Sequence, residues 1–411
     1  MNNGGDSMAS RREDVQYLEY IFSKFYDIGV NSYGGVTRLG YTKIEDEMHE
    51  MYKRLGEEEN FYTYIDEVGN TFVANDISDK EYYLIGSHLD SVVNGGRYDG
   101  VAGVLAGLLI LNWAKNDNLD IPIRVAGFRC EESSNFGKCT IGSGLITGEL
   151  TKDDVKGLVS KTGKSIIEIF NNKGYNLSPK KIENIKQYLE LHIEQGKVLE
   201  EYDIKVGIVS DIAGPRRFGI CIQGEAEHSG ATPMDMRADA LCAASEFILE
   251  LERLGQEEAY RKSVTTVGVL NNAPNVLNVI PGEVNLGIDI RGIDINSLDV
   301  IENNMKIIID KISKKRGVKF FLQDTGRFDP VKMSSYMQKK LIECSERLRI
   351  SHKVMPSGAG HDAMAFTRIC DTAMVFIPCY KGISHNKSEF SSLLSIYDGA
   401  KIIYEYLKGE K

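Results

Sequence analysis

The chain has 411 residues, of which 42% are hydrophobic and 26% are charged, a globular composition that excludes an intrinsically disordered protein and a small disulfide-stapled domain. At about 150 residues per domain, this length predicts two or possibly three domains. The 59 acidic residues outnumber the 49 basic ones, and the basic residues are scattered along the chain. Nucleic acid is therefore not expected as a partner, because binding it takes a clustered basic surface.

The sequence also carries no signal for a membrane or for export. The longest apolar stretch, residues 101–114, is shorter than the roughly 20 residues that a membrane-spanning helix needs. Residues 1–12 are polar and lack the apolar core of a signal peptide. The seven cysteines form no CxxC pair, which is typical of reduced thiols. We therefore expect a soluble, cytoplasmic protein with no membrane partner.

In chain order, the first eighty residues predict a helix, a loop and then strands. Residues 14–26 carry a helical apolar stripe, and residues 61–74 alternate around a turn at Gly69 and Asn70. The next elements alternate between strand and helix: a strand over 81–87, a helix over 100–113 and a strand over 121–129. This alternation predicts an α/β fold with a mixed, mostly parallel sheet, whose strand carboxyl ends collect the polar site residues.

From Gly214 onward the pattern changes. The predicted order is strand, helix, strand, strand, helix, strand, over residues 217–223, 236–254, 264–270, 283–291, 297–314 and 318–323. This order over about 110 residues is that of a ferredoxin-like unit. We interpret residues 214–327 as an inserted lid and dimerisation domain, and residues 1–213 plus 328–411 as a catalytic α/β/α domain. The α/β pattern resumes with a helix over 334–349, a strand over 371–377 and a helix over 391–407.

Histidines and carboxylates concentrate in short polar motifs. Four of the seven histidines have carboxylates, glycines or serines as neighbours: His88, His192, His361 and His385. Acids accompany them: Asp90 and the adjacent Glu131 and Glu132 at predicted strand ends, Asp99 after the turn at 94–96, and Glu194 just after His192. Nitrogen and oxygen ligands in this mixture suit zinc, with manganese or cobalt also possible, and they need no thiolate. Two metal ions would share a carboxylate.

Each of these pieces also has a purely structural interpretation. An HxD pair at a strand end is commonly a satisfied surface pair, and adjacent glutamates commonly lie on a solvated helix face. Glu131 and Glu132, however, follow the apolar residues 125–128, where two charges need partners. His385 alone could be a loop histidine. The joint occurrence of the motifs is what favours a metal site.

Eight segments, in order over roughly 300 residues, resemble one family. They are GSHLDSVVNGGRYDGVAGVLAG (86–107), EESSNFG (131–137), ELHIEQGKVLE (190–200), EAEHSGATPMDMRADA (225–240), NVLNVIPGEV (275–284), DIR (289–291), SGAGHDA (357–363) and GISHN (382–386). They are similar to the hydantoinase/carbamoylase amidases, which comprise N-carbamoyl-L-amino acid hydrolases and allantoate amidohydrolases. That family belongs to the aminoacylase and carboxypeptidase superfamily of dinuclear metallohydrolases.

The resemblance implies a site with two divalent metal ions per subunit, zinc or else manganese, cobalt or nickel. One ion would be held by His88, Asp99 and His192. The second would be held by Asp99, Glu132 and His385, with Asp99 bridging the two. His192, in place of an acid at the third ligand position, favours the amidase branch over the peptidases.

The resemblance also implies catalytic roles. Asp90 would orient His88 through its second ring nitrogen. Glu131 would be the general base that deprotonates the attacking water and later protonates the leaving nitrogen. His228, in the inserted domain, would reach the site across a homodimer and donate to the tetrahedral oxyanion. Its alternative role is a capping residue near Thr232.

Substrate contacts are implied as well: Arg291 and Asn278 for the carboxylate, Gln195 for the ureido group, one of Arg216 and Arg217 as an assisting cation, and Gly360 and His361 at the border of the pocket. A planar guanidinium suits the carboxylate because it donates to both oxygens in a fork. Strand alternation predicts that only one of the two adjacent arginines faces the site.

The sequence departs from the family at Ser133, where a glycine usually follows the paired glutamates, and Asn135 and Cys139 follow in a segment where specificity differs among relatives. The expected function is a homodimeric amidohydrolase that cleaves the ureido C–N bond of N-carbamoyl-L-amino acids to amino acid, ammonia and carbon dioxide. The alternatives are allantoate as substrate, an N-acyl amino acid deacylase or dipeptidase on the same scaffold, and a non-catalytic binding protein. The last is disfavoured because every metal position of the family, and Glu131, are present.

Overall fold

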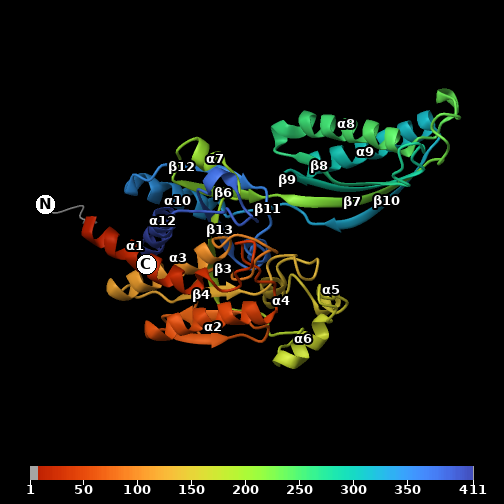
Figure 1. Cartoon of the computed structure of the whole chain (residues 1–411). Coiled ribbons are helices and arrows are strands. Elements are labelled where there is room, and N and C mark those ends of the chain that lie inside the picture. Colours follow the sequence, from red (N-terminus) through yellow and green to blue (C-terminus); the bar gives the residue numbers. More distant parts are fainter. Residues whose placement is uncertain (1–7, 411) are drawn as a thin grey trace. The chain divides into compact units, whose positions relative to one another are not determined.

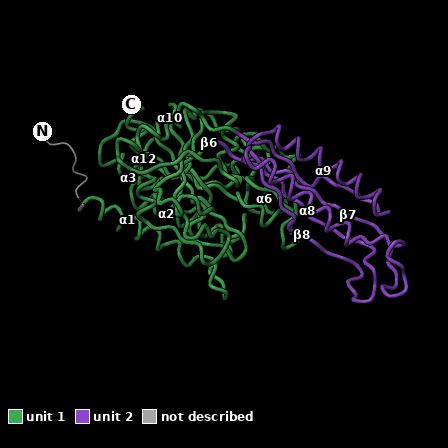
Figure 2. Tube along the Cα trace, turned by 90° about the horizontal axis from the view of Figure 1, so that it is seen from above, with its two compact units in different colours: residues 1–210, 332–411 green, residues 211–331 purple. Residues whose placement is uncertain are grey.

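The computed structural model describes residues 8–410, which form two compact units. Unit 1 consists of Met1–Ser210 and Lys332–Lys411, and unit 2 consists of Asp211–Val331 (Figure 2). The predicted insertion, residues 214–327, lies within unit 2. Among residues 8–410, no helix combines the length and the apolar character that crossing a bilayer requires.

Unit 1 is built on a nine-stranded mixed sheet with the order β1-β2-β4-β3-β5-β13-β6-β11, and with β12 paired to β6. The strands are β1 (Tyr62–Ile65), β2 (Thr71–Ala74), β3 (Tyr82–His88), β4 (Ile123–Phe128), β5 (Ile185–Ile193), β6 (Val206–Ile212), β11 (Val331–Lys332), β12 (His352–Ser357) and β13 (Asp371–Ile377). The four central strands, β4, β3, β5 and β13, run parallel. The predicted mixed, mostly parallel sheet is therefore confirmed, and four strand carboxyl ends lie along one edge of it.

Helices surround this sheet (Figure 1). They are α1 (Met8–Tyr26), α2 (Lys43–Glu58), α3 (Val101–Asn116), α4 (Ile141–Thr147), α5 (Lys152–Val155), α6 (Ile166–Lys173), α7 (Val198–Glu201), α10 (Ser335–Leu348), α11 (Ala363–Phe366), α12 (Leu393–Gly409) and the short 3-10 turn η3 (Tyr380–Gly382). Helix α3 is buried over its whole length from Val101 to Leu111, because it packs against the sheet and against α12 and α1. Its small residues permit this close approach: a Cβ at Gly103 would collide with the carbonyl oxygen of Leu191 in β5.

The prediction of a loop between the first helix and the first strands was wrong, because this segment contains helix α2. Its apolar side chains Met48, Tyr52 and Leu55 are spaced by four and three residues and are fully buried. Such a spacing places them on one helix face. The many charged residues between them conceal the stripe in the sequence.

Unit 2 contains an antiparallel sheet with the order β10-β7-β9-β8. Its elements are β7 (Gly214–Gln223), η1 (Met234–Met236), α8 (Ala240–Glu258), η2 (Ala259–Arg261), β8 (Val264–Ala273), β9 (Glu283–Gly292), α9 (Ile295–Arg316) and β10 (Lys319–Arg327). This is the predicted β-α-β-β-α-β order. Alternate residues of β7 and β9, such as Phe218, Ile220 and Ile288, are buried in a core with α8 and α9. Both helices lie on the same face of the sheet (Figure 1), so the intervening strand residues point to the opposite face.

Replacing Gly103 with alanine should destabilise unit 1. Alanine has the higher helix propensity, but its methyl group meets the Leu191 carbonyl in a packed interface, so we expect a loss of about 1–3 kcal/mol in the free energy of unfolding. Urea denaturation followed by circular dichroism measures the change. The matched control is Gly409→Ala at the end of α12, where an added Cβ has no neighbour within 4 Å. Equal stability of the two variants would contradict the packing argument.

Candidate metal centre and active site

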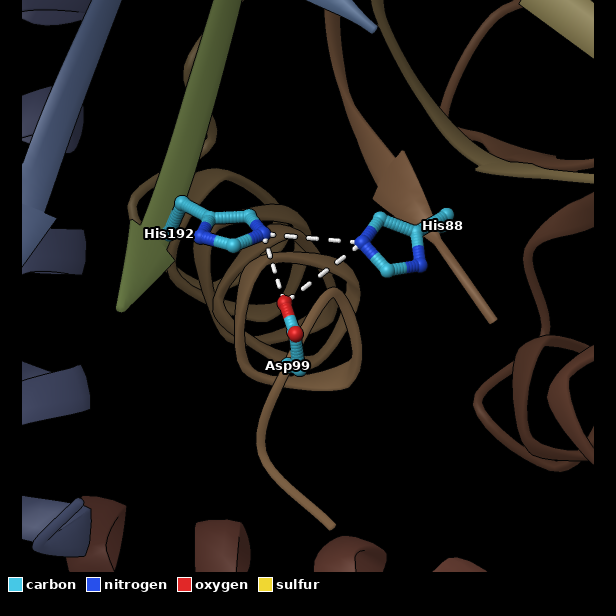
Figure 3. A group of neighbouring side chains, drawn as sticks. All are labelled: His88, Asp99 and His192. Carbon is cyan, nitrogen blue, oxygen red and sulfur yellow. Dashed lines mark hydrogen bonds and ion pairs between the residues drawn. The ribbon is translucent and has the colours of Figure 1, made fainter. Parts of the chain in front are cut away.

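Three side chains converge where the parallel strands end. His88 is the last residue of β3, His192 is the last but one of β5, and Asp99 directly precedes the turn into α3. Because β3 and β5 are parallel neighbours, their carboxyl ends meet at the same edge. The side chains of all three residues are buried. Figure 3 shows their ring nitrogens and carboxylate pointing at one another.

The distances within this group suit a metal ion. The Asp99 Oδ1 atom lies 3.0 Å from His192 Nε2 and 3.6 Å from His88 Nε2, and the two Nε2 atoms are 3.5 Å apart. These three atoms are close enough to one another to ligate a single cation.

The hydrogen bonds of the two histidines show which ring nitrogens are available. His192 Nδ1 donates to the carbonyl of Ile193 at 2.8 Å, and His88 Nδ1 faces the carbonyl and the carboxylate of Asp90 at 3.2 and 3.3 Å. Since these partners only accept, each Nδ1 atom carries a proton, and a ring that is otherwise unprotonated presents the lone pair of its Nε2 atom. The buried Asp99 Oδ1 lacks a hydrogen-bond donor among the described residues. Two lone pairs and an anionic oxygen facing one point fit a divalent cation.

A second group shares Asp99. Its other oxygen, Oδ2, lies 3.2 Å from His385 Nε2, and that nitrogen lies 3.0 Å from Glu132 Oε1. Asp99, Glu132 and His385 therefore form a second candidate cluster of three ligand atoms. Because each oxygen of Asp99 faces a different cluster, the carboxylate has the geometry of a bridge between two ions. The structure thus brings together the five side chains proposed as ligands.

Glu131 lies beside these clusters and outside both of them. Its Oε2 atom is 3.9 Å from His88 Nε2, and the side chain is buried. Burial raises the pKa of Glu131 well above its usual value, and although His88 opposes this shift, the carboxylate of Glu132 adds to it. A carboxylate with a raised pKa next to the ligands suits an acid–base role.

Asp90 has a second function that the sequence did not indicate. Its Oδ1 accepts a hydrogen bond from the backbone N–H of Glu131 at 3.0 Å, and its Oδ2 accepts one from Glu132 at 3.1 Å. One buried carboxylate thus positions His88 and the backbone of both glutamates.

The predicted contact residues of unit 1 also lie at this edge. The amide of Gln195 donates from Nε2 to Asp99 Oδ2 at 3.0 Å, so it points at the bridging carboxylate. His361 is buried, its Nε2 lies 2.8 Å from Ser357 Oγ, and its ring packs edge-on against His192. Burial lowers the pKa of His361 well below its usual value, so the ring is neutral. Gly360, which precedes it, is exposed.

In unit 2, strand alternation separates the two adjacent arginines. Arg216 is buried against α9, where it forms ion pairs with Asp299 at 2.6 Å and with Glu302 at 2.9 Å. Arg217 points to the opposite face of the sheet and pairs through Nε with Asp289 Oδ1 at 3.3 Å. The Nε of Arg291 binds the other oxygen of Asp289 at 2.8 Å. Arg217 and Arg291 therefore form one group, while Arg216 is engaged elsewhere.

His228 and Asn278 lie at the other end of the same sheet. Asn278 accepts a hydrogen bond from Ser229 N at 3.1 Å, and His228 forms a β-bridge with Val279. This loop pair precedes Glu283, the first residue of β9, whereas Arg291 is near the end of that strand. At about 3.3 Å per residue, the length of β9 separates Arg291 from this loop pair by about 26 Å or more. One substrate of amino-acid size cannot contact both ends within one chain.

Sequence reasoning missed two buried carboxylates close to this edge, Glu45 and Glu389. Glu45 in α2 accepts hydrogen bonds from Cys130 N at 2.8 Å and from Arg129 Nη1 at 2.8 Å, directly before Glu131. Burial raises its pKa to about 7, although Arg129 opposes the shift. Glu389 accepts hydrogen bonds from the backbone of Asp99 and His385. The only feature of the sequence that pointed to Glu389 was its position four residues after the motif histidine His385.

The chain is similar to hydrolases of a known family. The sequence profile of peptidase family M20/M25/M40 matches residues 84–409, so the chain belongs to this family of hydrolases and hydrolyses C–N bonds. It is 34% identical over 390 residues to an N-carbamoyl-L-amino-acid amidohydrolase from a Pseudomonas species, which covers 92% of this chain and 94% of that protein. It is 33% identical over 404 residues to the allantoate amidohydrolase of Escherichia coli, covering 94% and 96%.

A solved structure shares the whole fold. The amidase of the hydantoinase/carbamoylase family from Burkholderia multivorans superposes with a TM-score of 0.90 and 31% identity, over 96% of this chain and 97% of that one. The resemblance inferred from the motifs is thereby confirmed. The chain is an amidohydrolase of this family.

Replacing Glu131 with glutamine should separate catalysis from metal binding. Glu131 belongs to neither ligand cluster, so the variant should retain the metal content of the wild type and lose about 10²- to 10⁴-fold in kcat. Steady-state kinetics and elemental analysis of the purified protein measure both quantities. Glu132→Gln is the matched control, since it changes an adjacent, equally buried carboxylate that is a candidate ligand and should lose metal as well. Near-wild-type turnover of the Glu131 variant would refute the acid–base role.

Proposed function

We propose that the protein is a homodimeric, metal-dependent amidohydrolase that cleaves the ureido C–N bond of N-carbamoyl-L-amino acids. The observation that carries this proposal is the pair of ligand clusters sharing Asp99, with the separate buried carboxylate of Glu131 next to them. In the overall reaction, R–NH–CO–NH2 and water give R–NH2, carbon dioxide and ammonia. The names of the relatives support a substrate that carries a carbamoyl or ureido group.

Five side chains of unit 1 would hold the metal ions. His88, His192, Glu132, His385 and the shared Asp99 hold two divalent ions, zinc or else manganese, cobalt or nickel. When bound, such ions supply Lewis-acid chemistry, which polarises the amide carbonyl and lowers the pKa of water.

Glu131 moves the proton. Its carboxylate accepts a proton from the attacking water while the water oxygen bonds to the carbamoyl carbon, and it returns that proton to the leaving nitrogen as the C–N bond breaks. The proximity of Glu132 and the buried setting favour the protonated state of Glu131 after the first transfer, which makes it a competent acid for the second.

The charged group of unit 2 suits the substrate's carboxylate. Arg217 and Arg291 both bind Asp289 through their Nε atoms, so two guanidinium groups lie side by side on this face of the sheet. Guanidinium groups held by their Nε atoms are oriented for fork-like binding of a carboxylate. Arg216 is paired with two acids of α9, so of the two adjacent arginines we assign the assisting role to Arg217.

His228 and Asn278 would act on the site of a second subunit. His228 is exposed and would donate to the oxyanion that develops in the transition state, and Asn278 would accompany it. The separation between the two ends of β9 supports this arrangement, because only a second copy of the chain can bring both ends to one substrate.

Allantoate is the second candidate substrate, because the relatives that are named for it are as similar to this chain as those named for carbamoyl amino acids. An N-acyl amino acid deacylase or dipeptidase is a third. These activities differ in their products, since the first two release ammonia and the third releases only a new amine.

A substrate panel tests the proposal. The manganese-reconstituted enzyme is incubated with N-carbamoyl-L-amino acids, N-carbamoyl-β-alanine and allantoate, and ammonia is measured. Acyl amino acids and dipeptides are run alongside, and free amine is measured. We expect ammonia from a carbamoyl-L-amino acid. Ammonia from allantoate alone would transfer the assignment to that substrate, and amine without ammonia would refute the ureido reaction.

Mixing two inactive variants tests the shared site. Subunits with Glu131→Gln and subunits with His228→Ala are unfolded, mixed in equal amounts and refolded together. A mixed dimer then has one complete site only if His228 acts across the interface. About half of the dimers are mixed, so we expect about a quarter of the wild-type rate. If the mixture stayed as inactive as its components, His228 would act within its own subunit.

A further inference from the structure

A single buried carboxylate joins the two segments that carry Asp99 and His385. Glu389 is only 5% exposed. Its Oε1 atom accepts hydrogen bonds from the backbone N–H groups of Tyr98 at 2.9 Å and Asp99 at 3.0 Å. Its Oε2 atom accepts one from Ser384 Oγ at 3.1 Å and one from His385 N at 3.3 Å. Four donors from two segments almost 300 residues apart in the sequence therefore meet on one side chain.

The chain leaves room for this carboxylate at Gly96. A Cβ at this position would overlap the carboxyl carbon, Oε1 and Cβ of Glu389. Any side chain larger than a hydrogen would push Glu389 away from Tyr98 and Asp99. Gly96 lies in the turn before Asp99, and its lack of a side chain leaves the space that the Glu389 carboxylate occupies.

The two ligand clusters depend on Glu389 to different degrees. His88 and His192 belong to strands, where β3 pairs with β4 and β5 pairs with β13, so the sheet fixes their backbones. His385 lies outside any strand or helix, in a backbone conformation with φ of 55°, and its side chain is 48% exposed. Its backbone N–H is bound to Glu389.

We propose that Glu389 is a positioning residue that sets the separation of Asp99 and His385, and thereby forms the Asp99–Glu132–His385 cluster. The inference rests on the proposed two-metal site. The His88–Asp99–His192 cluster depends on Glu389 much less, because two of its three ligands are held by the sheet. Glu389 is thus a determinant of whether the second ion binds.

Glu389→Gln tests this at constant size. A glutamine keeps one accepting oxygen, but its NH2 group cannot accept from a backbone N–H. If it faces Tyr98 and Asp99, two hydrogen bonds are lost; if it faces Ser384, whose hydroxyl can turn to accept, and His385, the bond from His385 N is lost. We expect the affinity for the weaker of two Mn²⁺ ions to fall about 10- to 100-fold, and the affinity for the tighter ion to stay within about threefold. Isothermal titration of the full-length apoprotein with Mn²⁺ measures both constants. Electron paramagnetic resonance gives an independent readout, since the spin-coupled Mn²⁺ pair should be replaced by an isolated ion.

Two further variants complete the experiment. Gly96→Ala displaces Glu389 without changing it, so it should reproduce the selective loss of the weaker ion. Asp239→Asn is the matched control, because Asp239 is a carboxylate of unit 2 that accepts two backbone N–H bonds, from Leu241 and Cys242. It should bind two ions as the wild type does. Retention of the tight ion in Glu389→Gln shows that the variant is folded.

The outcomes separate the inference from the function on which it rests. Wild-type affinity for both ions in Glu389→Gln, or an equal loss of both in it and in Gly96→Ala, would overturn the positioning role and leave the proposed function intact. A wild-type protein that binds fewer than two ions would overturn both. Two ions in the wild type and one in the variant, without hydrolysis of any ureido substrate, would support the inference and refute the proposed substrate.

Discussion

Buried negative charge at the carboxyl edge of the sheet is the constraint on which the rest of unit 1 depends. The acids of this region that are 8% exposed or less include Glu45, Asp90, Asp99, Glu131, Glu132, Glu190, Glu194, Asp362 and Glu389. Burying charges of one sign is costly unless each one is hydrogen-bonded or neutralised. The backbone supplies part of the compensation, since Asp90, Glu194 and Glu389 each accept two or more main-chain N–H groups. The carboxylate oxygens of the candidate ligand clusters, such as Asp99 Oδ1, do not receive these backbone hydrogen bonds. A divalent cation neutralises such oxygens most effectively.

The same constraint explains why the site draws on the whole of unit 1. Parallel strands bring His88 and His192 together without either histidine leaving its strand, because pairing with β4 fixes the end of β3 and pairing with β13 fixes the end of β5. Ligands from loops lack that support. Asp99, Glu132 and His385 are each held instead by a carboxylate that binds their backbone, Asp90 for Glu132 and Glu389 for the other two. The carboxylates therefore form two layers. Those of the first layer face the candidate metal sites, and those of the second bind the backbone of the segments that carry the first.

The sequence could reveal the first layer and most of the fold. His88, Asp99 and His192 stand in recognisable motifs. The apolar run before His88 predicted strand β3, whereas β5, which carries His192, was not predicted. The second layer was largely hidden, because a residue such as Glu45 acts through a contact with Cys130 that only the fold creates, and its helix was masked by surrounding charges. Glu389 was close to a motif, but its partners at Tyr98 and Asp99 are distant in sequence.

The arrangement in unit 2 limits how the site can be completed. A strand is rigid along its length, so a hinge motion between the two units cannot shorten the distance between Arg291 and the loops of His228 and Asn278. If Arg291, His228 and Asn278 all contact one substrate, a hinge motion within a single chain cannot bring them together, however large the motion is. A second copy has no such restriction, because its own β9 can present the opposite end. If these proposed contacts are made, the separation is the physical reason for a dimer, and a monomer would have to function with one end of this sheet unused.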